Sequence, residues 1–284
     1  MSVATQPLTN YTKLKFLFES SVLQDRAEKE QYRWQVAISV LILFVIGSIL
    51  NIPFSRELKR LNIEAGKDVF LNESWFADLT AVGFSSLILG AILVFIGLWI
   101  TPSANLGAPV IARLFSKEPI SKAVKWKDVW TSILIGSLVA VILLGFFELQ
   151  KEFYPVAGKL DRPAKPFYAI VSFSAGITEE IMFRLGLMSL IIVIIQGIKK
   201  VETPTSGMVW TGMLISAVFF GLIHLPLSTN FVDINAFSIT VTMVGNLITG
   251  TTFGWIFWKR GLLIAILSHV AFDLVFHVLG SPYS

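Results

Sequence analysis

Long apolar blocks separated by short polar segments are the dominant pattern of this 284-residue chain. Inside the blocks the apolar positions follow neither a period of 2.0 nor one of 3.6, so the helices and strands of a soluble protein do not explain them. A helix of about 20 apolar residues crosses the hydrocarbon core of a bilayer. We therefore expect seven membrane spans, at about residues 34–53, 79–100, 129–149, 167–198, 208–225, 236–258 and 262–280.

The expected fold is an all-α, polytopic transmembrane bundle, because lipid cannot satisfy open backbone groups and the alternation typical of a membrane barrel is absent from the sequence. We expect a single transmembrane domain over residues 34–284, preceded by a polar tail over residues 1–33. The tail is either solvated or forms a short amphipathic helix on the membrane surface. The apolar residues that would face the lipid in that helix are Leu14, Leu17, Phe18 and Val22.

The fourth span is too long for one perpendicular helix and too short for two, so we expect a tilted or bent helix with Gly176 and Gly186 as bend points. Between these glycines lie three charges, Glu179, Glu180 and Arg184. An intramembrane charge costs about 2.5–3.5 kcal/mol and marks a candidate functional site. Glu180 and Arg184 are four residues apart and can form an ion pair, whose simplest role is to lock the helix. Glu179 is rotated by about 100° and can face another helix.

Composition and charge agree with a membrane protein: 15% of the residues are charged, against about 25% in soluble domains. Lys and Arg form no basic stripe, so we expect no nucleic-acid partner. The segments on the side of the N-terminus contain 14 Lys and Arg residues and those on the other side contain 8. This bias favours a cell-membrane protein with a cytoplasmic N-terminus and an outer C-terminus. The chain has no cysteine, which excludes disulfides and a cysteine nucleophile.

All three histidines lie in or at the end of late spans. His224 ends the fifth span, and His269 and Asp273 share one face of the seventh because they are four residues apart. For His277 the simplest interpretation is a hydrogen bond between helices. His224, His269 and Glu179 come from three different spans, so we expect a shared cavity between spans 4, 5 and 7.

Such a cavity could hydrolyse a bond in two ways. A carboxylate in apolar surroundings can act as a general base on water, and a histidine can hold that water or stabilise an oxyanion. Glu179, His224 and His269 also match a zinc ligand set with one open position. We favour the metal-free site, with no required cofactor, because neither histidine motif supplies paired ligands in the usual zinc spacings.

Three motifs in this order resemble the CPBP (Abi) family of intramembrane proteases, which includes the type II CAAX prenyl endopeptidases and bacteriocin-immunity proteins. The motifs are Glu-Glu-x-x-x-Arg (Glu179, Glu180, Arg184), Phe-x-x-x-His (Phe220, His224) and His-x-x-x-Asp (His269, Asp273). The run-up to the last histidine matches as well, at Gly250, Gly254, Trp255 and Arg260-Gly261-Leu262. The resemblance covers about residues 165–280, and the first three spans match only as hydrophobic helices.

The resemblance implies roles for most of these residues. Glu179 and His224 would activate the attacking water, and His269 would stabilise the oxyanion. Glu180 and Arg184 would orient Glu179 or bind substrate.

One position departs from the family pattern. Asp273 stands where the prenyl endopeptidases usually carry Asn. An ionised Asp accepts hydrogen bonds and cannot donate one to an oxyanion. It could instead fix the tautomer of His269 or help to bind a metal. Phe220 would have a supporting position at the site.

The leading hypothesis is therefore an intramembrane endopeptidase that hydrolyses a peptide bond in a membrane-associated or lipid-modified substrate. A cleft between helices would let this substrate enter sideways from the lipid bilayer. One alternative is a non-proteolytic membrane scaffold or a binding protein of the bacteriocin-immunity type. A second is a proton- or ion-coupled transporter, which the lack of internal repeats disfavours.

Overall fold

The structure is a computed structural model that describes residues 30–72, 74–101, 104, 106–153 and 160–280. Most of the polar tail, with its expected surface helix, lies outside the described residues. The described part is helical and contains no strand. Seven of its helical segments are long and apolar enough to cross a membrane, which confirms the all-α bundle. These spans are Arg33–Glu64, Trp75–Ile100, Trp126–Leu149, Lys165–Lys199, Ser206–Ser228, Ala236–Arg260 and Leu262–Leu279.

Several spans contain more than one helical element. The first half of the chain contains α3 (Arg33–Leu50), α4 (Ile52–Glu64), α5 (Trp75–Phe95), the π-helical η2 (Ile96–Ile100), α6 (Pro109–Arg113), the 3₁₀ turn η4 (Ile120–Lys122) and α7 (Trp126–Phe153). The second half contains α8 (Lys165–Glu179), the π-helical η5 (Glu180–Met188), α9 (Ser189–Lys199), α10 (Ser206–Ser228), α11 (Ala236–Arg260), α12 (Leu262–Asp273) and the π-helical η6 (Leu274–Leu279).

The first span is longer than the sequence pattern predicted, because the polar helix α4 continues it to Glu64. Charge pairs explain why this polar stretch stays helical. Arg60 pairs with Glu57 and Glu64 on the same helix, at the spacings that bring side chains together. Arg56 pairs with Asp78 at the start of α5, which joins the two helices.

The fourth span is continuous from Lys165 to Lys199, and its irregularity is a π-helical segment over Glu180–Met188. Such segments are rare in proteins as a whole, and those that occur are often found at functional sites. The two glycines that we expected to be bend points also lie against neighbouring helices. A Cβ atom at Gly176 would lie 2.6 Å from Val270 Cγ2 on α12, and one at Gly186 would lie 2.7 Å from Leu93 Cδ2 on α5. Both glycines therefore allow neighbouring helices to approach closely.

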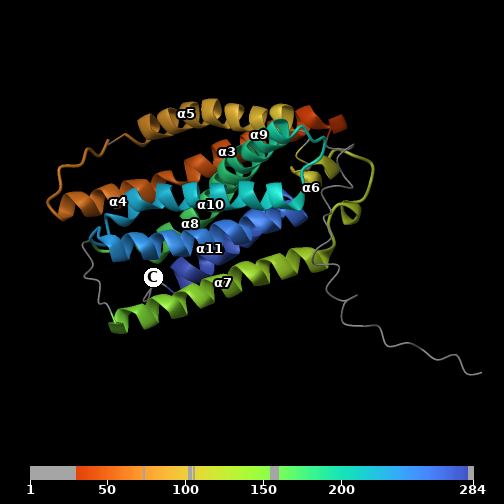
Figure 1. The fold of residues 1–284 in the computed structure, drawn as a ribbon. Helices are drawn as coiled ribbons and strands as arrows, with labels where there is room; N and C mark the ends of the chain where they lie inside the picture. The colour runs from red at the N-terminus through yellow and green to blue at the C-terminus, as the bar shows by residue number, and fades with distance from the viewer. Residues whose placement is uncertain (1–29, 73, 102–103, 105, 154–159, 281–284) are drawn as a thin grey trace, which may run out of the picture.

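The helices run between two ends of the bundle (Figure 1). One end contains the α4–α5 connection, the end of α7, the start of α8 and the α10–α11 connection. The other contains α6, the end of α9 and the α11–α12 turn. The central helix α12 packs against α7, α8 and α11, and nine of its twelve residues are buried.

The end that contains α6 is filled with protein, and we call it the closed end. The segment between α5 and α7 folds inward there, and five of its residues join the hydrophobic core: Ala104, Leu106, Ala108, Ile111 and Ala112. Leu262 N donates a hydrogen bond to Gly107 O at 2.9 Å, and Arg260 pairs with Asp128 at 2.5 Å. Gly261 has a φ of 83° and faces Pro109 so closely that a Cβ atom would lie 2.5 Å from Pro109 Cδ.

The contact between α7 and α12 depends on Gly136. A Cβ atom at Gly136 would lie 2.2 Å from the backbone oxygen of Ser268. We expect Gly136→Ala to destabilise the protein by roughly 1–3 kcal/mol, because two helix backbones must move apart. Gly145→Ala on the same helix is the matched control, since its Cβ would meet nothing within 4 Å. Unfolding of the purified variants in detergent measures the difference, and equal stabilities would contradict it.

Candidate active site

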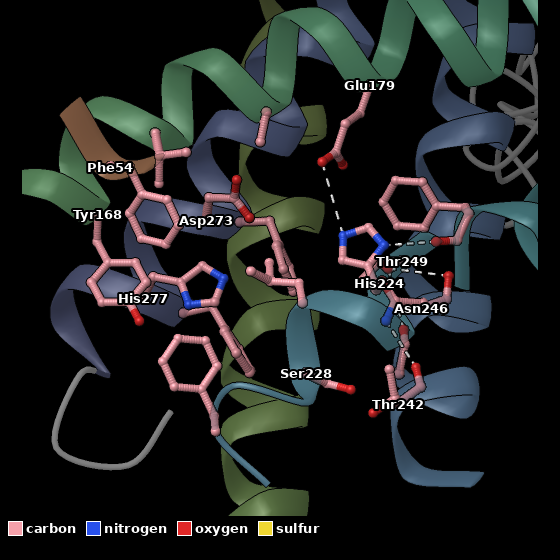
Figure 2. Close-up of a pocket in the computed structure, with 18 of the residues that line it drawn as sticks. Phe54, Tyr168, Glu179, His224, Ser228, Thr242, Asn246, Thr249, Asp273 and His277 are labelled. Carbon is pink, nitrogen blue, oxygen red and sulfur yellow. Dashed lines mark hydrogen bonds and ion pairs between the residues drawn. The ribbon is translucent and has the colours of Figure 1, made fainter. Parts of the chain in front are cut away.

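A cavity of about 730 Å³ lies inside the bundle and contains the predicted site. Glu179, His224, His269 and Asp273 all line it, so the structure brings these residues together. Figure 2 shows the cavity from one side. The cavity is wider than the space between spans 4, 5 and 7 that the sequence predicted. Residues of α4, α7 and α11 line it as well, because its walls extend from the site towards one end of the bundle.

Glu179 occupies the last position of α8, next to the π-helical segment. Its Oε1 lies 3.9 Å from Nε2 of His224 on α10, and its Oε2 lies 3.8 Å from Nε2 of His269 on α12. Both distances exceed hydrogen-bond length. One partly exposed carboxylate therefore faces two imidazole rings from two other helices, as the motifs predicted.

The ring of His224 is held by its own helix. Its Nδ1 lies 2.7 Å from the carbonyl oxygen of Phe220, one turn earlier. A carbonyl oxygen only accepts, so Nδ1 carries the hydrogen, and in the neutral ring Nε2 is an acceptor. The helix continues past Pro226 to Ser228, so His224 lies within α10 rather than at its end. Nε2 of His224 is thus turned towards Glu179 as a proton acceptor (Figure 2).

His269 is held from a different direction. Its Nδ1 lies 2.9 Å from Glu180 Oε1, and its ring stacks on Phe253 with centroids 4.4 Å apart. Its Nε2 faces Asp273 Oδ2 at 3.8 Å as well as Glu179. Glu180 therefore contacts His269 and fixes its orientation, as carboxylates commonly do for functional histidines. The resemblance had suggested that Glu180 orients Glu179.

Arg184 completes the support behind His269. Its Nε lies 3.2 Å from Glu180 Oε2, which is the ion pair that the spacing predicted. Its guanidinium also lies over the ring of Phe220, 5.1 Å from the centroid. Both charges are buried, with 0% of Glu180 and 1% of Arg184 exposed, and neither side chain lines the cavity. The geometry supports a positioning role for this pair rather than contact with substrate.

His277 lines the cavity, and its Nδ1 does not take part in the hydrogen bond between helices that we expected for this residue. That atom is buried and has no hydrogen-bond partner among the described residues. The ring stacks on Tyr168 instead, with centroids 5.2 Å apart and an interplanar angle of 10°. Stacking joins η6 to the start of α8 at one wall of the cavity (Figure 2).

Sequence reasoning missed the wall that α11 supplies. Thr242, Asn246 and Thr249 line the cavity opposite Glu179. Asn246 Nδ2 donates to Thr242 O, and Thr249 Oγ1 donates to Asn246 O, so both side chains are tied to their own helix. The signal was present: three polar residues at spacings of four and three share one face of a span.

The zinc alternative can be tested against the donor geometry. A zinc ion needs its nitrogen and oxygen ligands within about 2.0–2.2 Å of one point. Among the residues that the structure describes, no group of three or more His, Asp or Glu side chains could hold a metal ion. As they stand, the donor atoms of Glu179, His224 and His269 do not converge on one point at zinc-binding distance.

The fold and the site together define a multi-pass membrane protein with a carboxylate and two histidines that face one another inside its bundle. Residues 162–275 match the family of type II CAAX prenyl endopeptidases that is described as Rce1-like. This match includes α8 to α12 and every candidate site residue, and it agrees with the resemblance to the CPBP family that the three motifs indicated. It also supports an endopeptidase activity of the CAAX type. Comparisons with curated proteins and with solved structures gave no match.

Proposed function

We propose that this protein is an intramembrane endopeptidase in which Glu179 and His224 activate a water molecule that attacks a peptide bond. One observation carries the proposal: the carboxylate of Glu179 faces Nε2 of His224 and Nε2 of His269, at 3.9 and 3.8 Å, on the wall of a cavity. These three groups come from three helices that the fold must bring together. Phe220 and Glu180 orient the two rings through Nδ1.

The spacing suits a water molecule rather than direct contact. Polar groups that lie more than 3.5 Å apart are commonly bridged by water. Such a water would donate one hydrogen to Glu179 and the other to Nε2 of His224, which accepts because its Nδ1 is bonded to Phe220. Its oxygen lone pair then remains free to attack a substrate carbonyl carbon.

The hydrolytic step follows from these roles. Glu179 takes a proton from the water as its oxygen bonds to the carbonyl carbon, and the carbonyl electron pair moves to oxygen. His269, in its protonated form, donates Nε2–H to this oxyanion. Glu179 then passes its proton to the amide nitrogen, and the carbon–nitrogen bond breaks. The products are a new carboxylic acid and a new amine, and the only reactants are the peptide bond and one water molecule.

The shape of the cavity supports a membrane-bound substrate. Beyond the site its walls are mostly apolar and aromatic, including Phe54, Tyr168, Phe231 and Phe276. Walls of this kind bind apolar side chains or a lipid chain. Arg162 also lines the cavity and lies over the ring of Phe231. We propose that an apolar segment or lipid group of the substrate occupies this part.

A reconstituted cleavage assay tests the proposal. Purified protein in liposomes is incubated with a membrane-anchored peptide, farnesylated or held by an apolar helix, and the products are identified by mass spectrometry. We expect cleavage of at least one anchored peptide, and no loss after treatment with a chelator. Loss on chelation with recovery on added zinc would overturn the metal-free mechanism. No cleavage of any anchored peptide would count against the protease.

Asp273 gives a test of the oxyanion side of the site. We expect Asp273→Asn to cleave at least as fast as the wild type, because an amide can donate to the oxyanion and carries no repelling charge. Initial rates in the same assay measure this, with Asp273→Ala as the comparison that removes both properties. A loss of more than about tenfold, equal to about 1.4 kcal/mol in the barrier, would mean that the carboxylate itself is required.

A further inference from the structure

The cavity extends towards only one end of the bundle among the parts that the structure describes. Besides the site and the inner faces of α7, α8 and α11, its lining includes residues of α4 and of the connections and helix ends at the end opposite α6. These lining residues are Phe54, Ser55, Leu58, Leu160, Arg162, Tyr168, Leu227, Ser228, Phe231 and Val232. We call this the open end; in Figure 1 it is where α4, α7 and α10 finish.

At the closed end, packed residues separate the cavity from the surface of the protein. The segment between α5 and α7 is packed into the core there, and Ala104, Leu106 and Ala112 are at most 1% exposed. The buried pair of Arg260 and Asp128 joins α11 to α7 behind it. A substrate segment or a water molecule therefore approaches Glu179 from the open end or sideways through the lipid.

The two ends differ sharply in charge. The segments at the closed end, with the N-terminal tail that precedes α3, contain 14 Lys and Arg residues and 7 acidic ones. The segments at the open end contain 8 Lys and Arg residues and 9 acidic ones. The four remaining charges belong to the site. Short segments rich in Lys and Arg are retained in the cytoplasm during insertion, and this bias sets the orientation of a multi-pass protein.

The charge bias and the direction of the cavity together carry the inference. We propose that the site opens on the face of the membrane opposite to the cytoplasm, so that its substrate is a membrane-anchored polypeptide whose cleaved segment lies on that face. The substrate class rests on the proposed protease function, whereas the direction of opening does not. Cytoplasmic proteins with a lipid-modified C-terminus would then lie on the wrong side of the membrane.

The face of the membrane on which the cavity opens can be measured directly by thiol labelling. The chain has no cysteine, so each engineered thiol is the only one in it. Asp161→Cys places a thiol on the exposed surface of the open end, and Lys122→Cys places one on the exposed surface of the closed end. Ser228→Cys places one in the cavity. None of these residues belongs to the catalytic groups. Each variant is expressed in a bacterial host, and spheroplasts are treated with a membrane-impermeant maleimide before and after permeabilisation.

We expect Asp161→Cys and Ser228→Cys to react in intact spheroplasts, and Lys122→Cys to react only after permeabilisation. The reverse pattern would overturn the proposal. Labelling of Asp161→Cys without Ser228→Cys would overturn it too, because the cavity would not communicate with that face.

The substrate class has its own test. Two reporters with the same apolar anchor and the same peptide segment, one presenting the segment outside and one inside, are co-expressed with the wild type or with Glu179→Gln. Cleavage of the outer reporter alone, dependent on Glu179, is the expected result. Cleavage of the inner reporter alone would overturn the substrate class. If neither reporter is cleaved while the thiols react as expected, the protease function fails and the orientation stands.

Discussion

Replacement of Glu179 by Gln is expected to lower the cleavage rate by about 10²–10⁴-fold, the range that a general base contributes. The amide has nearly the same size but cannot take a proton from water. Glu179 makes no hydrogen bond to either histidine, and its Oε2 has no hydrogen-bond partner among the described residues. The substitution should therefore leave folding and substrate binding unchanged and act on kcat rather than KM. Single-turnover cleavage of an anchored peptide measures the effect.

The matched control is Glu202→Gln, which makes the same chemical change on an exposed residue at the closed end. It should cleave at the wild-type rate. A Glu179→Gln variant that cleaves as fast as this control would exclude Glu179 as the base. The site would then be a binding site, as in the scaffold alternative, or would use another group on the cavity wall.

Removal of the charge of Arg184 is expected to have the largest effect on stability. In Arg184→Met the carboxylate of Glu180 stays fully buried and loses its arginine, keeping only the contact with His269, and breaking a buried ion pair costs about 3–5 kcal/mol. Glu180 also holds Nδ1 of His269, so activity should fall with stability. Unfolding of the purified protein in detergent gives the first quantity, and the anchored-peptide assay gives the second.

The double variant Glu180→Gln with Arg184→Met separates the charge from the packing. Both charges are then absent, and replacement of a whole buried pair by neutral groups of similar volume is often close to neutral. We expect the double variant to regain most of the lost stability. If it is no more stable than Arg184→Met alone, the loss comes from packing against Phe220 rather than from an unpaired carboxylate.

Much of the architecture followed from local sequence patterns. Hydropathy located all seven spans. An unpaired backbone group in lipid is so costly that a long apolar segment crosses the membrane as a helix. The spacing of four residues predicted the pair of Glu180 and Arg184 on one helix, and the structure contains it. Local patterns did not show contacts that depend on neighbouring helices. Gly176 was expected as a bend point, and the structure adds a close contact with Val270, more than 90 positions later.

The sequence by itself determined the membrane bundle, the span boundaries to within a few residues in most cases, and the residue types at the site. Hydropathy and helical period are properties of single segments, so they need no partner to be read. Only the tertiary structure decided which groups meet: Glu179 with two histidines, and Glu180 with His269, 89 positions away. It also placed α4, α7 and α11 around the cavity and closed one end of the bundle. These are contacts between helices, and the period of one helix does not specify which face of another lies against it.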